Sequence, residues 1–251
     1  MSLHLDIQIV SDVICPWCYL GNARLDKALA RLTENYPHHI SVSKLWIPYL
    51  LNPTMVEGQH SMSKRNMYLK KFNNNNQQVQ RMEQKISDLY VKAGLPPYTL
   101  DGKVGATFAA HRLMALAKEQ NRATELMHVL FRQYHSEGKS PSVHANLVEA
   151  SVEAELQNID VLSFLKSDEK LNEVAAALQT NAHVFPMLSG VPHFRLAVAS
   201  RTNKELRVHS VIPGAQDVST FLLSIGKFLT RAGYSTESVV AAAVGQIESK
   251  M

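Results

Sequence analysis

The sequence predicts an α/β fold in which one mixed sheet is built from both ends of the chain, with a helical insertion between them. Three observations support this prediction. The N-terminal part has the pattern of strand, helix and strand; the middle has several helical stretches; the C-terminal part has two strands and a helix. We place the sheet-forming part at residues 1–58 and 184–251, and the insertion at residues 59–183.

The N-terminal elements follow from the spacing of apolar residues. Residues 3–10 alternate in part between apolar and polar side chains, which is typical of a strand. Residues 15–34 carry apolar residues at helical spacing, and residues 40–46 alternate again. Asn52-Pro53 and Glu57-Gly58 then indicate a loop. This part is therefore predicted to be strand, helix and strand.

The middle of the chain is predicted to be a helical bundle. Residues 61–93 are mostly helical in composition, interrupted by the polar run 73–78, for which we expect a surface loop. Gly94 and the prolines after it end that stretch. Residues 104–183 are rich in alanine and leucine and contain several helical stretches. Breaks between these helices are expected near Asn121 and at residues 137–139, 157–158 and 167–168.

The C-terminal part is predicted to complete the sheet. Residues 193–199 and 205–211 have the pattern of a strand pair joined through residues 201–204. A helix is expected to start within Pro213-Gly214-Ala215-Gln216-Asp217 and to end at Gly233, because glycine commonly follows the last helical residue.

The two cysteines of the chain, Cys15 and Cys18, are separated by Pro16 and Trp17. A pair this close can form a local disulfide or share a metal, but it cannot link distant parts of the chain. Cys15 is placed at a helix N-terminus, with Pro16 in the first turn. Unpaired backbone N–H groups and the helix dipole there favour the thiolate, so we expect a lowered pKa for Cys15. Redox chemistry also requires that the two sulfurs face each other and are not sealed from solvent.

Two structural interpretations compete with a reactive pair. Each cysteine could be a small buried apolar residue, although a helix start after a strand is a reactive environment. The pair could also be half of a zinc site completed by His38-His39. Those histidines lie at the far end of the first predicted helix and do not match the usual four-ligand spacing. We therefore predict no metal.

Charge and hydropathy narrow the classes of function. The net charge of +4 is dispersed, with no run of five Lys or Arg residues, so a nucleic-acid surface is not expected. No apolar stretch approaches membrane-spanning length, and the N-terminus lacks the pattern of a secretory signal. The lack of structural disulfides fits a reducing compartment. We expect a cytoplasmic protein that binds neither nucleic acid nor membrane, and the sequence leaves its oligomeric state open.

The order of motifs resembles a known family. A strand, CxxC at a helix start, and much later Val-Pro before a hairpin and a final helix resemble the thioredoxin fold, and the insertion resembles its DsbA-type variant. Residues 11–21 resemble the opening of FrnE-like oxidoreductases. The other stretches that carry this resemblance are Leu51-Asn52-Pro53, Ala110-His111-Arg112-Leu113, Ser189-Gly190-Val191-Pro192 and Pro213-Gly214-Ala215-Gln216. 2-Hydroxychromene-2-carboxylate isomerases and kappa-class glutathione transferases share the same overall plan.

The resemblance implies a substrate-binding site around the cysteines. It makes Pro192 a cis proline that faces the active site, and it implies that the backbone of Val191 pairs with an extended peptide or glutathione. The alternative for Pro192 is a trans proline at a strand edge. Gln216 lies where relatives bind the γ-glutamyl end of glutathione, with helix capping as its alternative. Trp17 is assigned, with Pro16, to the substrate surface, and helix packing is its alternative.

The sequence does not assign roles to three further polar residues. His111 and Arg112 lie on a predicted helix of the insertion, where they either face the cleft or are satisfied within the bundle. His193, with Arg195 after it, stands where relatives often carry small or apolar residues after Val-Pro. This departure leaves the substrate preference open.

The preferred function is a thiol–disulfide oxidoreductase. The Cys15 thiolate attacks a substrate disulfide, and Cys18 then resolves the mixed disulfide. We expect no tightly bound cofactor, glutathione as a candidate co-substrate, and a disulfide-containing peptide or small thiol as partner. One alternative is a glutathione-dependent isomerase or transferase, although those relatives carry serine in place of the first cysteine. The other alternative is a redox-inactive peptide-binding or chaperone module.

Overall fold

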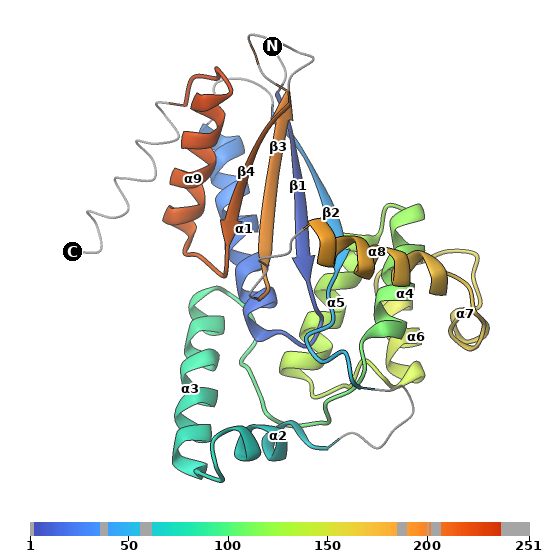
Figure 1. Ribbon diagram of the computed structural model, residues 1–251. Coiled ribbons are helices and arrows are strands. Elements are labelled where there is room, and N and C mark those ends of the chain that lie inside the picture. The colour runs from blue at the N-terminus through green and yellow to red at the C-terminus, as the bar shows by residue number, and fades with distance from the viewer. Residues whose placement is uncertain are drawn as a thin grey trace.

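The computed structural model describes residues 3–35, 40–55, 62–184, 190–199, 201 and 207–236 (Figure 1). Its four strands are β1 (Leu3–Ser11), β2 (Ile40–Pro48), β3 (His193–Ala199) and β4 (Arg207–Pro213). They form one sheet in the order β2-β1-β3-β4. β1 and β2 are parallel, whereas β3 pairs antiparallel with both β1 and β4. The mixed sheet built from both ends of the chain is therefore confirmed.

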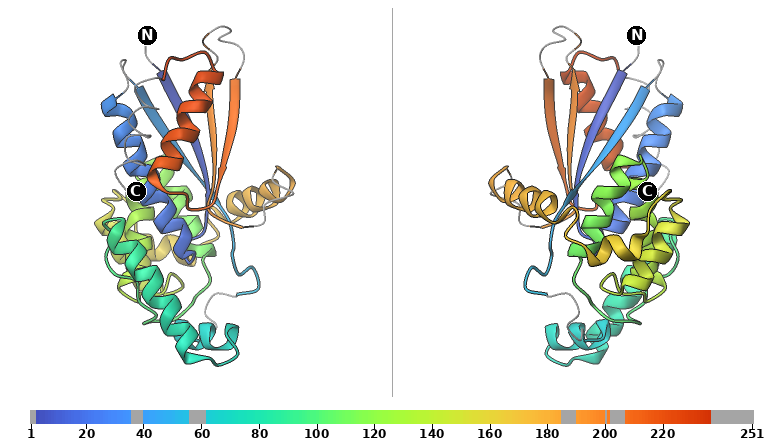
Figure 2. Two further views of the ribbon diagram at one scale, coloured as in Figure 1. Left: turned by 90° about the vertical axis from the view of Figure 1, so that its left-hand side faces the viewer. Right: turned by 90° about the vertical axis from the view of Figure 1, so that its right-hand side faces the viewer.

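One face of this sheet is covered by helices α1 (Pro16–Asn35) and α9 (Val218–Arg231), as the side views show (Figure 2). Side chains alternate along the strands: Leu5, Ile7 and Ile9 of β1 are buried, whereas His4 is exposed. Because successive side chains of a strand point to opposite faces, this alternation buries one face of β1. The alternation that predicted the strand thus determines which face the helices cover.

Among the described residues, seven helices lie between β2 and β3, and they gather around the end of the sheet at which β1 stops (Figure 1). Chain reversals occur where breaks were expected, with positive φ angles at Asn121, Gly138 and Asn158. The helices are α2 (Lys64–Lys71), α3 (Asn76–Lys92), α4 (Phe108–Glu119), α5 (Ala123–Ser136), α6 (His144–Glu153), α7 (Val161–Lys166) and α8 (Leu171–Val184).

Two details of the sequence prediction were wrong. Within the polar run 73–78, α3 has already begun at Asn76, because the Asn75 side chain caps it by accepting the N–H of Gln78. In the C-terminal part, β4 extends to Pro213 and α9 starts at Val218, with Asp217 as its N-cap. The left-handed conformation of Gly214 separates the strand from the helix, so residues 213–217 are a connection.

Buried apolar residues form two clusters. One lies between the sheet, α1 and α9. The other belongs to the insertion and also includes Cys15, which precedes α1, and Cys18 and Tyr19 of its first turns. The CPWC segment therefore lies where the insertion packs against the sheet-forming part. The expected boundary at residue 58 lies outside the described residues, so the division into 1–58 with 184–251 and 59–183 stays a prediction.

Candidate active site

The CPWC segment lies at the end of β1 and opens α1. A tight turn connects them, in which the Cys15 N–H donates to the Asp12 carbonyl at 3.1 Å. α1 begins at Pro16, whose missing N–H costs nothing at this position. Cys15 therefore immediately precedes the helix, as predicted, and Cys18 lies one turn away.

The two sulfur atoms lie 3.6 Å apart, and both cysteines are free thiols. This separation is longer than the roughly 2.05 Å of a disulfide but close enough for one to form by a small movement. The Cys15 thiol donates to the Val191 carbonyl at 3.4 Å. Cys15 is 3 % exposed and Cys18 is 1 % exposed. The sulfurs face each other, as the redox prediction requires, but both cysteines are buried, so the second requirement, access to solvent, is not met in this conformation.

The two thiols have opposite shifts in acidity. A hydrogen bond from Cys18 is the largest cause that lowers the pKa of Cys15, followed by the backbone N–H groups of Cys18 and Trp17, and these outweigh burial. Burial raises the pKa of Cys18 well above its usual value, and the neighbouring Cys15 adds to this effect. The lowered pKa of Cys15 was predicted. Its main cause is the second thiol, however, and the helix N–H groups come after it.

The Val191–Pro192 peptide bond is cis, as the resemblance implied. Pro192 packs against α1 at Gly21, where an added Cβ would lie 2.9 Å from the Pro192 Cγ atom and 3.2 Å from the Ala215 Cα atom. The Pro192 carbonyl accepts the N–H of Gly214 at 2.9 Å. Glycine at position 21 thus lets the proline loop and the connection before α9 approach the cysteine-bearing helix.

A buried carboxylate lies beside the turn. Asp12 is fully buried; one of its oxygens accepts the Leu51 N–H at 2.7 Å, and the other lies 3.6 Å from His111 Nε2. The same His111 nitrogen is 3.0 Å from the Tyr49 carbonyl. Sequence reasoning treated Asp12 as an ordinary loop residue. Its position three residues before Cys15 was the available signal.

Two side chains of the insertion hold backbone carbonyls of the turn. Tyr90 of α3 donates its hydroxyl to the Pro16 carbonyl at 2.9 Å, and His135 of α5 lies with Nε2 2.9 Å from the Val13 carbonyl. Both residues are fully buried, and burial lowers the pKa of His135 to about 3, so its ring is neutral. Sequence reasoning missed both, because nothing local connects them with a segment more than 70 residues earlier.

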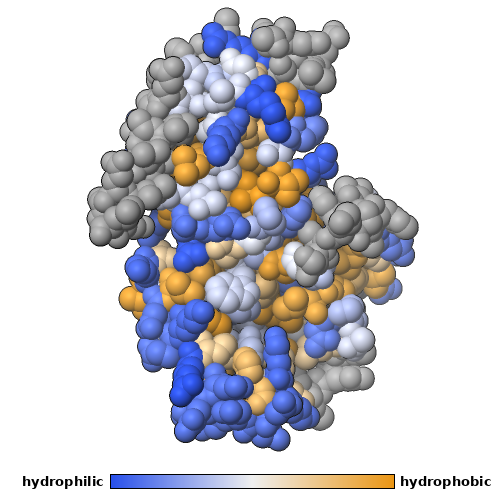
Figure 3. Space-filling view, turned by 60° about the vertical axis from the view of Figure 1, so that its left-hand side comes forward, coloured by the Kyte–Doolittle hydropathy of each residue, from blue (hydrophilic) through white to orange (hydrophobic). Residues whose placement is uncertain are grey.

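The remaining predicted site residues surround the cysteines unevenly. Pro16 is buried, whereas Trp17 is 42 % exposed and so is not a packed core residue. In space-filling view, hydrophobic residues form a band across the middle of one face of the molecule (Figure 3). Gln216 donates its side-chain amide to the Pro213 carbonyl, and Asp217 caps α9, so capping is not the role of Gln216.

The structure shows the surroundings of Arg112, His111 and His193, whose roles the sequence left open. Arg112 is buried within the bundle, where its guanidinium donates to the carbonyls of Phe164, Leu165, Ser167 and Glu169. Because these groups close the end of α7, the role of Arg112 is structural. His111 lies beside Asp12, behind the turn. Burial lowers the pKa of His193, which opens β3 directly after the cis proline.

Within the described ranges, no group of three or more His, Cys, Asp or Glu side chains is arranged to hold a metal ion. His38-His39, the pair considered for zinc, lies outside those ranges. None of the described helices is long and apolar enough to span a membrane.

The chain matches the DSBA-like thioredoxin domain over residues 6–226, which include the CPWC turn, the insertion and the cis proline. It belongs to this family. The DsbA-like recognition and the thioredoxin-like fold with a helical insertion are thereby confirmed. No curated protein matches the chain.

Solved structures show the same fold. A probable DsbA oxidoreductase from Streptomyces coelicolor is 28% identical, with a TM-score of 0.76 and coverage of 90% of this chain and 91% of that one. The cytosolic disulfide reductase DsbM from Pseudomonas aeruginosa, solved with GSH, is 13% identical, with a TM-score of 0.51 and coverages of 97% and 99%. A 2-hydroxychromene-2-carboxylate isomerase is 12% identical, with a TM-score of 0.56 and coverages of 91% and 98%.

Proposed function

We propose that this DsbA-like protein is a thiol–disulfide oxidoreductase of the FrnE-like subgroup that uses Cys15 as nucleophile and Cys18 as resolving cysteine. The observation that carries the proposal is the pair of free thiols 3.6 Å apart at the start of α1, opposite the cis Val191–Pro192 bond. The opposite pKa shifts of the two thiols support different roles for them, with Cys15 as nucleophile and Cys18 as resolving cysteine. The cysteine that ionises more easily attacks first, and the buried one stays protonated until it is needed.

The reaction proceeds in two exchanges. The Cys15 thiolate attacks one sulfur of a substrate disulfide, so that bond breaks, a Cys15–substrate disulfide forms, and the other substrate sulfur leaves as a thiolate. Cys18 then loses its proton and attacks Cys15, which releases the second substrate thiol. The substrate gains two electrons and the Cys15–Cys18 pair becomes a disulfide. A thiol such as glutathione returns the pair to its reduced form, with no tightly bound cofactor.

The proposed substrate site comprises Pro16, Trp17, Val191, Pro192 and Gln216. The Val191 carbonyl accepts the Cys15 thiol in the free protein, so an entering peptide or glutathione disulfide displaces this contact and pairs with the same backbone. Trp17 offers an exposed aromatic surface beside the sulfur. The DsbM structure, which contains GSH, makes glutathione a reasonable first co-substrate to test. A peptide or small thiol partner in the cytoplasm remains part of the proposal.

Reduction of insulin or of glutathione disulfide tests the proposal. Wild type is expected to turn over, Cys15→Ser to be inactive, and Cys18→Ser to accumulate a mixed disulfide with the substrate, visible as added mass. Iodoacetamide should label the reduced native protein at Cys15 and not at Cys18. Equal turnover by Cys15→Ser, or a Cys15 that is not alkylated unless the protein is denatured, contradicts the assignment.

The isomerase or transferase alternative remains second. Its relatives use serine in place of the first cysteine, whereas here a thiol with a lowered pKa occupies that place. Conjugation of an aromatic electrophile with glutathione that survives Cys18→Ser would favour this alternative.

A redox-inactive peptide-binding or chaperone module is the third candidate function. Suppressed aggregation of a client protein by the double cysteine variant, without redox turnover by wild type, would favour it.

A further inference from the structure

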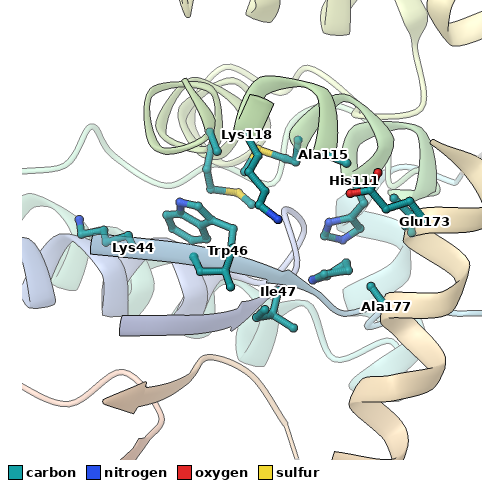
Figure 4. Close-up of a pocket in the computed structure, with 14 residues that line it drawn as sticks. Lys44, Trp46, Ile47, His111, Ala115, Lys118, Glu173 and Ala177 are labelled. Atoms are coloured by element: carbon teal, nitrogen blue, oxygen red, sulfur yellow. The ribbon is translucent and has the colours of Figure 1, made fainter. Parts of the chain in front are cut away.

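A cavity of about 150 Å³ lies between the edge strand β2 and helices α4, α5 and α8 (Figure 4). It is lined by neither of the cysteines nor by any of the proposed substrate-site residues. Most of its wall is apolar, from Trp46, Ile47, Met114, Ala115, Met127 and Ala177. The Trp46 indole N–H donates to Thr124 at 3.1 Å, which fixes the ring at the cavity wall. The cavity therefore offers a rigid aromatic surface to an occupant.

The polar side chains at this cavity are engaged elsewhere, with one exception. Lys44 pairs with Asp26, and Glu173 pairs with Lys170 at 3.0 Å. His111 is held by the Tyr49 carbonyl. Lys118 has no hydrogen-bond or ion-pair partner in the described part of the chain, and it extends from α4 toward the space between Trp46 and His111 (Figure 4). An ammonium group at the edge of an apolar space is a recognition element for an anion.

The surroundings of the mouth strengthen the preference for an anion. Lys118 also lines a hollow on the sheet face opposite α1 and α9, together with Arg195, Arg207 and His209. Asp6, the acid in that hollow, is paired with Arg207. Burial, followed by the charges of Arg195 and Arg207, lowers the pKa of His209, so the positive charge of this hollow comes from Arg195, Arg207 and Lys118. Clustered positive charge raises the local concentration and association rate of anions.

We propose that this cavity binds a small aromatic carboxylate, with the ring against Trp46 and the carboxylate on the Lys118 ammonium. An apolar protein cavity of about 150 Å³ is known to hold one benzene molecule, so the volume fits a single ring. Burial of the ring against indole and thioether side chains supplies affinity, and the charged hydrogen bond supplies selectivity for an acid. No cysteine takes part, so the site is independent of the redox proposal.

Binding of 4-fluorobenzoate can be measured by ¹⁹F NMR and by fluorescence of Trp46 in a Trp17→Phe protein, since the chain has two tryptophans. The neutral 4-fluorobenzamide is the matched ligand. We expect saturable binding of the acid, about tenfold or more above the amide. Lys118→Met should remove that preference, whereas Lys92→Gln, on the exposed end of α3, should leave it unchanged.

Two cavity-filling variants test the location. Ala115→Leu on α4 and Ala177→Leu on α8 fill the space from different helices, so one remains informative if the other fails to fold. Each folded variant should lose binding by about tenfold or more. The proposal is overturned if wild type shows no saturable binding up to about 10 mM, if amide and acid bind equally, if Lys118→Met binds the acid like wild type, or if the filled variants still bind. Tighter binding of hexanoate would overturn the aromatic assignment.

Discussion

Replacement of Gly21 by alanine should disturb the contact between α1 and the cis-proline loop. Gly21 is buried in α1, and its missing side chain leaves room for Pro192 and Ala215. A Cβ atom built there lies 2.9 Å from the Pro192 Cγ atom, 3.2 Å from the Ala215 Cα atom and 3.3 Å from the Ala215 Cβ atom. Two of these neighbours belong to a ring and a main chain, so neither can turn away as a flexible side chain would. The loop must move.

Two opposing energies set the size of the effect. In an ordinary helix interior, glycine to alanine stabilises by about 0.5–1 kcal/mol, because the unfolded chain loses conformational freedom. Forcing a methyl group into a packed contact costs about 1–3 kcal/mol. The contact distances show that Gly21→Ala forces a methyl group into a packed contact, so this cost should exceed the gain from reduced chain freedom. We expect the variant to lose about 1 kcal/mol in free energy of unfolding. Displacement of Pro192 should also weaken the hydrogen bond from Cys15 to the Val191 carbonyl.

Urea unfolding of the reduced protein at pH 7 measures the first effect, with the slope of the transition compared between variants. Ala30→Gly, at an exposed position of the same helix, gives the intrinsic difference between the two residues in α1, which we expect to be about 0.5–1 kcal/mol. The rate of Cys15 alkylation measures the second effect and should rise. If Gly21→Ala stabilises the protein by as much as Ala30→Gly destabilises it, the close approach does not exist and the reasoning is wrong.

Three other predictions concern the groups around the turn. Cys18→Ala should raise the pKa of Cys15, read from the pH dependence of alkylation, because the largest stabilising hydrogen bond is lost; an unchanged pKa would assign the shift to the helix N–H groups. Tyr90→Phe should cost about 1 kcal/mol in urea unfolding through the lost bond to the Pro16 carbonyl, and no loss would contradict that bond. The folded pKa of His135, about 3, lies below the unfolded value near 6.5, so the unfolded chain binds more protons between them and stability falls on acidification. Between pH 7 and 5 the expected loss is about 2 kcal/mol, and His135→Gln, which keeps an N–H donor, should remove that part of the pH dependence.

The sequence predicted most of the fold because the signals for it are local. Alternation over residues 3–10 placed β1 to within one residue, and the chain reversals of the insertion fell near the polar and glycine-containing breaks. The connection before α9 was misassigned, because Pro213 and Gly214 suit both a helix start and the end of a strand. Which of these forms depends on pairing with β3, and that pairing is a tertiary contact.

The candidate site was predicted in part. Cys15 and Cys18 followed from spacing, while Pro192 and Gln216 needed the family resemblance. Asp12 lies three residues before Cys15, so the sequence could have identified it as a candidate site residue. Tyr90 and His135 could not have been found, because their roles depend on the backbone carbonyls that they reach in a distant segment. The degree to which Val191 covers Cys15 was equally out of reach.

Chain-local chemistry thus determined the α/β architecture, the pair of neighbouring cysteines and the lowered pKa of Cys15, since periodicity, cysteine spacing and a helix start act over a few residues. Tertiary structure decided which groups surround that pair: a cis proline held against Gly21, a buried Asp12, and carbonyls fixed from α3 and α5. It also placed Lys118 at an apolar cavity, with no partner among the residues that the structure describes. Such features depend on packing between segments far apart in the sequence, and local sequence patterns do not predict which of those segments come into contact.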